Sequence, residues 1–180
     1  MRKVLYILGQ LSDSDVDWLA RTGKRTKCVA GTTLITSGVS LSQLFFVLDG
    51  ELSIQTSKGF ELARVGSGEI LGEMSLVDSH PPSASVLVLQ DAFVLALDKA
   101  MVQEKLDIDT GFASRFYRAI AIFLSERMRS TIGRMGYGDD NDDDDESAEL
   151  DDEDELDSNV LDNVHLAGAR FERLLNKLMG

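Results

Sequence analysis

The chain has one cysteine, two prolines and no apolar run long enough to cross a membrane. Its single cysteine, Cys28, excludes a disulfide within the chain and is typical of a reducing compartment, so we expect a cytoplasmic protein. Cys28, His80 and His165 are not spaced like metal ligands, and no metal site is predicted. A membrane-spanning helix needs about 20 mostly apolar residues. Without such a run, the sequence predicts no membrane partner.

Basic residues are missing from the acidic segment 139–157. This segment holds 14 of the 31 Asp and Glu residues, so 17 acidic residues remain against 18 basic ones and the rest of the chain is nearly neutral. Such a composition repels itself and has little to bury. We therefore expect a folded domain over 1–135, an acidic disordered linker over 136–157 and an amphipathic helix over 158–180. An alternative role for the acidic segment is to mask a basic surface made of Arg115, Arg118, Arg127, Arg129 and Arg134.

Short apolar and β-branched segments alternate with turn residues between Thr26 and Asp98. The Asp49-Gly50 pair separates two such segments and is a hairpin signal. Regular short strands of this kind predict a mainly β fold of jelly-roll type, with helices at its flanks. The predicted strands cover residues 26–29, 33–36, 44–48, 51–56, 60–65, 84–89 and 92–97.

Helices are predicted on both sides of the strands. Ser12 is placed to cap a helix that runs to about Thr22, with Asp15 at the capping-box position. A short helix is expected from Lys99 to Leu106, and Thr110 is expected to cap a long helix. The apolar stripe of the long helix consists of Phe112, Phe116, Ile120, Phe123, Leu124 and Met128.

A final amphipathic helix is predicted after the acidic segment, with Ser158 as its cap. Its apolar face holds Leu161, Val164, Gly168, Phe171, Leu174 or Leu175, and Leu178. An isolated helix of about twenty residues is marginal in water unless that face docks somewhere. The sequence leaves open whether it docks on another protein or on its own domain.

Residues 66–86, GSGEILGEMSLVDSHPPSASV, have the character of an anion site. Glycines at 66, 68 and 72 allow tight turns and close backbone approach. Residues Glu73 to Leu76 are predicted to form one helical turn that opens directly after a glycine, where free N–H groups suit an anion. No Lys or Arg occurs from Val65 through Asp98.

The run Gly72-Glu73-Met74-Ser75-Leu76, followed by Pro81 and Ser83-Ala84-Ser85-Val86, resembles the phosphate-binding cassette of the cyclic-nucleotide-binding domain family. The similarity extends over about Leu11 to Gly133. It implies a jelly-roll β-barrel (double-stranded β-helix) of cyclic-nucleotide-binding type. It also implies that Glu73 holds a ribose 2′-hydroxyl and that backbone amides of Ser75, Ser83 and Ala84 approach the cyclic phosphate. The candidate ligand-binding residues are therefore Gly72, Glu73, Met74, Ser75, Ser83 and Ala84.

The family's phosphate-binding arginine falls on Pro82 in this chain. Arg64 and His80 could reach in, but both lie off the family's position. Loss of one partner from a buried charge pair costs about 2–5 kcal/mol, whereas a helix N-terminus returns about 0.3–1 and at best about 2 kcal/mol. We therefore expect weak or absent binding of a cyclic nucleotide, which is the one ligand predicted, and no cofactor.

Two functions are consistent with the sequence. The favoured one is a non-catalytic regulatory or interaction module with weak or absent nucleotide binding. The alternative is a sensor of cyclic AMP or cyclic GMP that transmits binding through its C-terminal helices. No catalytic residue is predicted, because Asp78, Ser79 and His80 are more simply a turn before Pro81.

The expected partner is another protein, contacted through the C-terminal helix or the long helix. A homodimer through residues Phe112 to Met128 is one such form. Nucleic acid is not expected as a partner, because an acidic segment and one helix follow the long helix where catabolite activators carry a helix-turn-helix.

Overall fold

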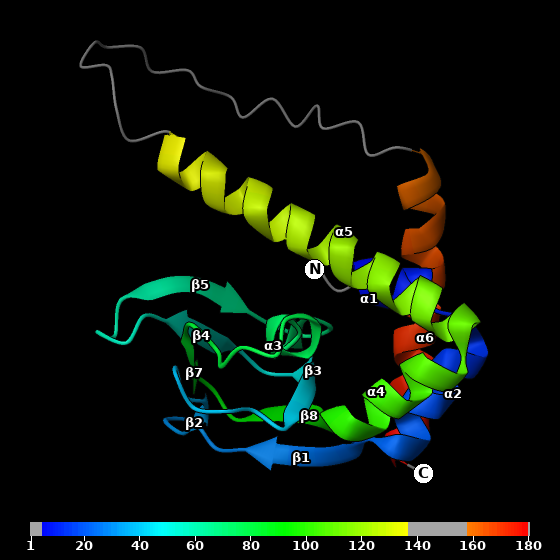
Figure 1. Cartoon of the computed structure of the whole chain (residues 1–180), viewed down its shortest axis with the longest axis horizontal. Helices are drawn as coiled ribbons and strands as arrows, with labels where there is room; N and C mark the ends of the chain where they lie inside the picture. Colours follow the sequence, from blue (N-terminus) through cyan, green and yellow to red (C-terminus); the bar gives the residue numbers. More distant parts are fainter. Residues whose placement is uncertain (1–4, 137–157, 180) are drawn as a thin grey trace.

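The computed structural model describes residues 5–136 and 158–179, so the predicted acidic linker lies outside the described residues except for Gly136. Helices flank a central set of strands (Figure 1). The elements, in chain order, are α1 (Leu5–Gln10), α2 (Asp13–Thr22), β1 (Lys24–Cys28), β2 (Thr33–Ile35), β3 (Gln43–Asp49), β4 (Leu52–Gln55), β5 (Glu61–Val65), β6 (Ile70–Leu71), α3 (Met74–Val77), β7 (Ser85–Val88), β8 (Ala92–Asp98), α4 (Lys99–Ile108), α5 (Thr110–Gly136) and α6 (Ser158–Met179).

Two antiparallel sheets of four strands face each other and form the predicted jelly roll. Their strand orders are β1-β8-β3-β6 and β2-β7-β4-β5. The prediction of a hairpin at Asp49-Gly50 is wrong, because this turn joins β3 of the first sheet to β4 of the second, and the two strands do not pair. Gly50 has φ of +99°, and a Cβ at this position would lie 2.5 Å from the Cβ of Ala92. Only glycine therefore fits this turn without a shift of β8.

Strand β3 is buried on both faces, which explains its uninterrupted apolar sequence. Side chains alternate along a strand, so Phe45 and Val47 enter the core between the two sheets, while Leu44 and Phe46 enter the core under the helices. Strand β8 does the same with Val94 and Ala96 on one face and Leu95 and Leu97 on the other. The first sheet is thus the shared wall of two hydrophobic cores.

The helices pack on the outer face of this wall. Trp18 of α2 contacts Phe112 of α5 with ring centroids 5.3 Å apart, and Phe116 stacks on Phe112 at the same separation. Helix α5 continues past this cluster and runs over the second sheet (Figure 1). Within the described ranges, no helix combines the length and apolarity that crossing a membrane requires.

Three details of the helices differ from the sequence prediction. Helix α1 was not predicted, and its Ile7 and Leu8 are buried in the helical core. Asp109, and not Thr110, caps α5, because its carboxylate accepts a hydrogen bond from the N–H of Phe112 at 2.9 Å. Met128 is 63% exposed, so the apolar stripe of α5 ends before it.

The inward residues of α5 are buried within their own chain. Phe112, Phe116, Ile120 and Phe123 all belong to the helical core. A homodimer through the predicted range would therefore have to use its exposed positions, Tyr117 and Met128 among them. The predicted basic surface is also reduced, since Arg115, Arg127 and Arg129 form ion pairs with Asp15, Glu73 and Glu126.

Asp15 joins the start of α2 to α5. Its carboxylate completes the predicted capping box with Ser12, whose N–H donates to it at 2.7 Å. The guanidinium of Arg115 donates two hydrogen bonds to the same carboxylate, at 2.7 and 3.0 Å. Burial acts to raise the pKa of Asp15, but the bonds from Arg115 and Ser12 outweigh it and hold this pKa below its ordinary value.

We expect Asp15→Ala to lower the free energy of unfolding by about 1–2 kcal/mol at pH 7, the usual cost of a lost cap with a modest addition from Arg115. Because the pKa of Asp15 is lowered in the folded state, its contribution is present at neutral pH and is lost as the pH falls below about 4. Urea denaturation at several pH values would check this. Ser14→Ala is the control, because Ser14 contacts only the hydroxyl of Ser12. A difference between Asp15→Ala and the wild type that persists at pH 2 would contradict the assignment.

Candidate functional site

A cavity of about 710 Å³ lies between the second sheet, α3 and α5. All six candidate ligand-binding residues line it: Gly72, Glu73, Met74, Ser75, Ser83 and Ala84. The sheet contributes apolar side chains, including Ile35, Ile54 and Val86, and α5 contributes Arg127 and Thr131. The volume falls within the range of about 300–1,000 Å³ that is usual for small-molecule sites.

Gly72 holds the backbone in the conformation that places Glu73 in this cavity. Its φ is +85°, and a Cβ there would lie 2.8 Å from Leu41 and 3.1 Å from the carbonyl oxygen of Gln43. Glu73 follows with α-helical angles and leads into the predicted helical turn, α3. The glycine thus allows β6 to turn directly into α3, which brings the Glu73 side chain under α5.

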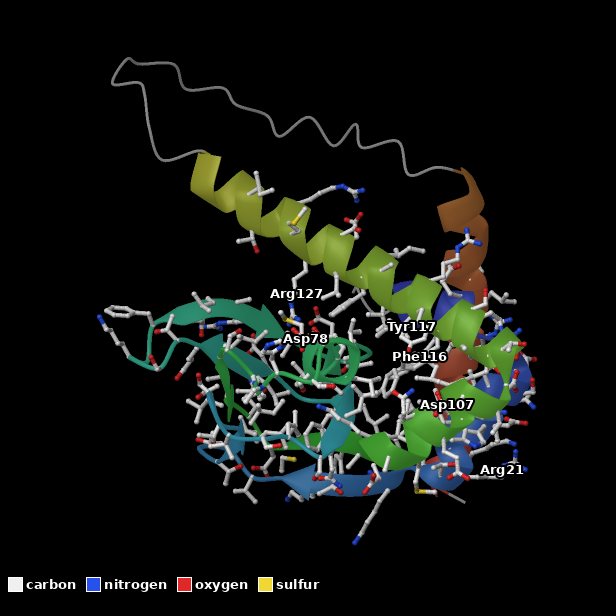
Figure 2. All side chains as sticks on the ribbon, in the orientation of Figure 1. Arg21, Asp78, Asp107, Phe116, Tyr117 and Arg127 are labelled. Carbon is white, nitrogen blue, oxygen red and sulfur yellow. The ribbon has the colours of Figure 1, made fainter. Side chains whose placement is uncertain are left out.

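Glu73 is engaged by an arginine from α5. Its carboxylate is 2% exposed, and its Oε1 accepts a hydrogen bond from Nη1 of Arg127 at 2.6 Å. Figure 2 shows Arg127 on the side of α5 that faces α3. The guanidinium also lies over the ring of Phe123, 5.1 Å from its centroid. Its Nη2 is buried and has no hydrogen-bond partner among the described residues.

Burial raises the pKa of Glu73 above its ordinary value, and the positive charges of Arg127 and Lys99 act against this rise. Lys99 lies at the start of α4 and donates to the hydroxyl of Ser75, which in turn donates to the carbonyl of Gly72 at 3.2 Å. Lys99 is not among the residues that line the cavity. Of the described Lys and Arg side chains, only Arg127 lines it.

The second half of the cassette presents backbone donors. Among the described residues, no hydrogen bond involves the N–H of Ser83 or Ala84. Their loop is anchored from the other side, because Gly38 donates to the carbonyl of Pro82 at 2.8 Å and the hydroxyl of Ser37 donates to that of Ser83 at 3.0 Å. These two N–H groups can therefore donate hydrogen bonds to an anionic oxygen without breaking an existing bond.

The two cations considered from the sequence do not replace the missing arginine. Arg64 is exposed and is not among the cavity-lining residues; it pairs with Glu61, which does line the cavity, at 2.9 Å and with Glu51 at 3.5 Å. His80 lines the rim, but its side chain is 80% exposed and lies 3.5 Å from Asp78.

Comparisons with known proteins agree with this geometry. The family model described as "Cyclic nucleotide-binding domain" matches residues 25–109. A cyclic nucleotide-binding domain from Methylobacillus flagellatus superposes with a TM-score of 0.69 at 23% identity, over 77% of this chain and 84% of that one. This barrel has the cyclic nucleotide-binding domain fold.

Other relatives carry similar barrels. The N-terminal domain of a transcriptional regulator from Streptomyces coelicolor A3(2) has a TM-score of 0.57 at 29% identity, over 77% of this chain and 99% of that one. The Pycsar effector protein XpPycTIR from Xanthomonas perforans is 30% identical over 83 residues, which are 46% of this chain and 27% of that protein. The chain spans about a quarter of the length of this relative and of an uncharacterized NTE family protein from Mycobacterium bovis.

Arg127 is the functional residue that sequence reasoning missed. From the sequence it is expected only as part of a basic surface, and no Lys or Arg occurs between Val65 and Asp98. A signal was present, because Arg127 continues the buried positions Phe116, Ile120 and Phe123 at helical spacing. A charged residue on the buried stripe of a helix predicts a buried partner.

We expect Arg127→Met to lower the free energy of unfolding by about 2–3 kcal/mol at pH 7, because it leaves the Glu73 carboxylate buried without its partner. Glu73→Gln in the same chain should restore most of this loss. The single variant should become more stable as the pH falls from 7 toward 5, because a carboxyl with a raised pKa takes up its proton in the folded state first.

Urea denaturation at pH 7 and pH 5 would measure both effects. Arg129→Met is the matched control, because Arg129 is exposed and pairs with Glu126 at the surface. If the Arg127→Met and Arg129→Met variants lose equal stability, the Glu73–Arg127 pair does not have the role assigned to it.

Proposed function

We propose that the chain is a non-catalytic regulatory module in which Arg127 holds Glu73 and keeps affinity for cyclic nucleotides low. The supporting observation is the 2.6 Å bond between these side chains. The residue that the family resemblance assigns to the ribose is already engaged by a helix of the same chain.

The competition can be given a magnitude. A hydrogen bond to a charged group contributes about 1.5–3 kcal/mol, and a ribose hydroxyl would replace a charged donor with a neutral one. At about 1.4 kcal/mol for each factor of ten, this lowers affinity by about 10- to 100-fold. This loss of affinity adds to the loss expected because Pro82 stands where the family has its phosphate-binding arginine.

The second candidate is a cyclic-nucleotide sensor, and two observations favour it. The cavity is large enough for such a ligand, and the Nη2 of Arg127 is buried without a partner on a side chain that lines it. In this alternative the cyclic phosphate binds Arg127 in place of Glu73, and the ribose binds Glu73 in place of Arg127. Helix α5 would then move with the guanidinium that it carries.

Calorimetric titration of the full chain with cyclic AMP and cyclic GMP separates the two candidates. The regulatory module predicts dissociation constants weaker than about 100 µM. It further predicts that Glu73→Gln binds as well as the wild type or better, because the change frees Arg127 for the phosphate and keeps an acceptor for the ribose.

A sensor predicts the opposite. Its wild type would bind more tightly than about 1 µM, and Glu73→Gln would weaken binding by at least about tenfold, since the ribose would lose a charged acceptor. Glu61→Gln is the matched control, because Glu61 also lines the cavity but pairs with Arg64 and Ser53 and does not contact Arg127. Sub-micromolar binding by the wild type would end the first proposal.

A further inference from the structure

Helix α6 docks on α1 and α2, on the far side of the helical core from the cavity. It contacts both helices, and Figure 1 shows it beside them. Ala167 and Leu174 are fully buried in the helical core, and Phe171, Leu175 and Leu178 pack partly against it. The predicted apolar face of α6 therefore docks on its own domain, apart from Leu161 and Val164, whose side chains are outside the described residues.

Arg170 of α6 caps the end of α1. Its Nη1 donates to the carbonyl oxygens of Leu8 at 3.2 Å and Gly9 at 3.1 Å, and its Nε donates to Asp13 at 2.9 Å. The last carbonyls of a helix have no partner within the helix and carry its negative dipole end, so a guanidinium suits this position. The Arg170 side chain is 13% exposed, which makes it the most buried cation of α6 among those in ion pairs.

Two further cations of α6 lie on the acidic side of α2. Arg173 donates two hydrogen bonds to the carboxylate of Asp17, at 2.7 and 2.8 Å, and Lys177 lies 2.8 Å from the same carboxylate. Hydrogen bonds from Arg173 and Lys177 hold the pKa of Asp17 far below its ordinary value. Asp17 is therefore charged near neutral pH, where the contact is sensitive to salt and not to pH.

The contact of α6 with α1 and α2 uses specific polar partners but contributes modest stability. Among the α6 side chains that the structure describes, Ala167 and Leu174 are fully buried. The side chains of Arg173, Lys177 and Asp13 are 43%, 42% and 58% exposed, and ion pairs of such exposed groups are weak and screened. The family match ends at residue 109, so α6 lies outside the part of the chain that the family model covers. Residues 137–157, which join α6 to α5, carry no basic residue and do not duplicate its cations.

We propose that the surface formed by Leu8, Gly9, Asp13 and Asp17 is a receptor for a basic amphipathic helix of a partner protein, and that α6 is its built-in competitor. The partner helix would carry Arg-x-x-Arg-x-x-x-Lys on one side, as Arg170, Arg173 and Lys177 do, with small and leucine side chains on its apolar side. Charge complementarity favours a basic helix as the partner, because the surface offers two carboxylates and two helix-end carbonyls.

The intramolecular helix sets a threshold for the partner. A tethered segment has an effective concentration on the order of millimolar, so a free helix of equal intrinsic affinity does not displace α6 at micromolar concentration. A change that weakens α6 alone lowers this threshold and leaves the receptor intact. This proposal uses neither the cavity nor a nucleotide, so its failure would not bear on the proposed function.

The test uses the full chain and a fluorescent peptide of residues 158–180. Arg173→Glu removes the two hydrogen bonds that Arg173 donates to Asp17 and leaves the receptor surface itself unchanged, so that the peptide can bind Asp17 once α6 is released. Fluorescence anisotropy should show the peptide binding to Arg173→Glu at least about tenfold more tightly than to the wild type, whose receptor is occupied. Raising the salt from about 0.05 M to about 0.5 M should weaken this binding.

Three controls make the result specific. Arg118→Glu carries the same change of charge on α5, where Arg118 is exposed and has no ion pair among the described residues, and it should bind the peptide no better than the wild type. A peptide that itself carries Arg173→Glu should not bind. A chain with both Arg173→Glu and Asp17→Lys should lose the binding gained by Arg173→Glu alone.

Hydrogen exchange of residues 165–178 reports whether α6 has been released. If Arg173→Glu leaves these amides as protected as in the wild type, Leu174→Glu is the second variant, because it places a charge at a fully buried position of α6. A folded variant with a released α6 that does not bind the peptide overturns the proposal. Equal peptide binding by the wild type and Arg118→Glu, at the level of Arg173→Glu, overturns it as well. So does a stable dimer that exchanges α6 between two copies, since the occupant would then be a second copy of this chain.

Discussion

The arrangement of this domain depends on one buried carboxylate. Glu73 enters the space beneath α5 because Gly72 turns the chain there, and a carboxylate that is 2% exposed needs a compensating charge. Arg127 supplies it from a helix more than fifty residues later in the chain. The pair therefore fixes where α5 crosses the second sheet. It also determines that the Glu73 carboxylate is bonded to Arg127. The same contact sets the packing of α5, its position and the engagement of Glu73 in the candidate site.

Much of the fold was predictable because its signals are local. Alternating short strands and the capping box at Ser12 and Asp15 each depend on a few neighbouring residues, and the structure confirms them. The turn at Asp49-Gly50 was also predictable, but not that it passes from one sheet to the other, because strand pairing is not a local property. Helix α1 was missed because six residues give little periodicity. Its two buried side chains gain their environment from α5 and α6, which no local pattern reports.

In the candidate site, too, the local features were predictable and the long-range contact was not. The six cassette residues were placed around one cavity by short-range chain geometry, and their role toward a ligand stays a prediction. Their electrostatic partner was not found, because a search along the sequence near Pro82 cannot see a helix that returns from residue 127. The missing arginine of the cassette and the arginine of α5 are therefore separate facts. The first lies where the family resemblance predicts the phosphate, and the second pairs with Glu73, the residue that the resemblance assigns to the ribose.

Helix α5 is held at two points by arginines of its own. Arg115 is bonded to Asp15 at the start of α2, and Arg127 is bonded to Glu73 in the cassette. The two residues are twelve positions apart, about 18 Å along a helix that rises about 1.5 Å per residue. A helix that is held at two points resists rotation, whereas a helix that is held at one point can pivot there. Without the bond to Glu73, α5 would stay anchored by its buried residues from Phe112 to Phe123, so the part that could shift over the second sheet is the part that follows Phe123.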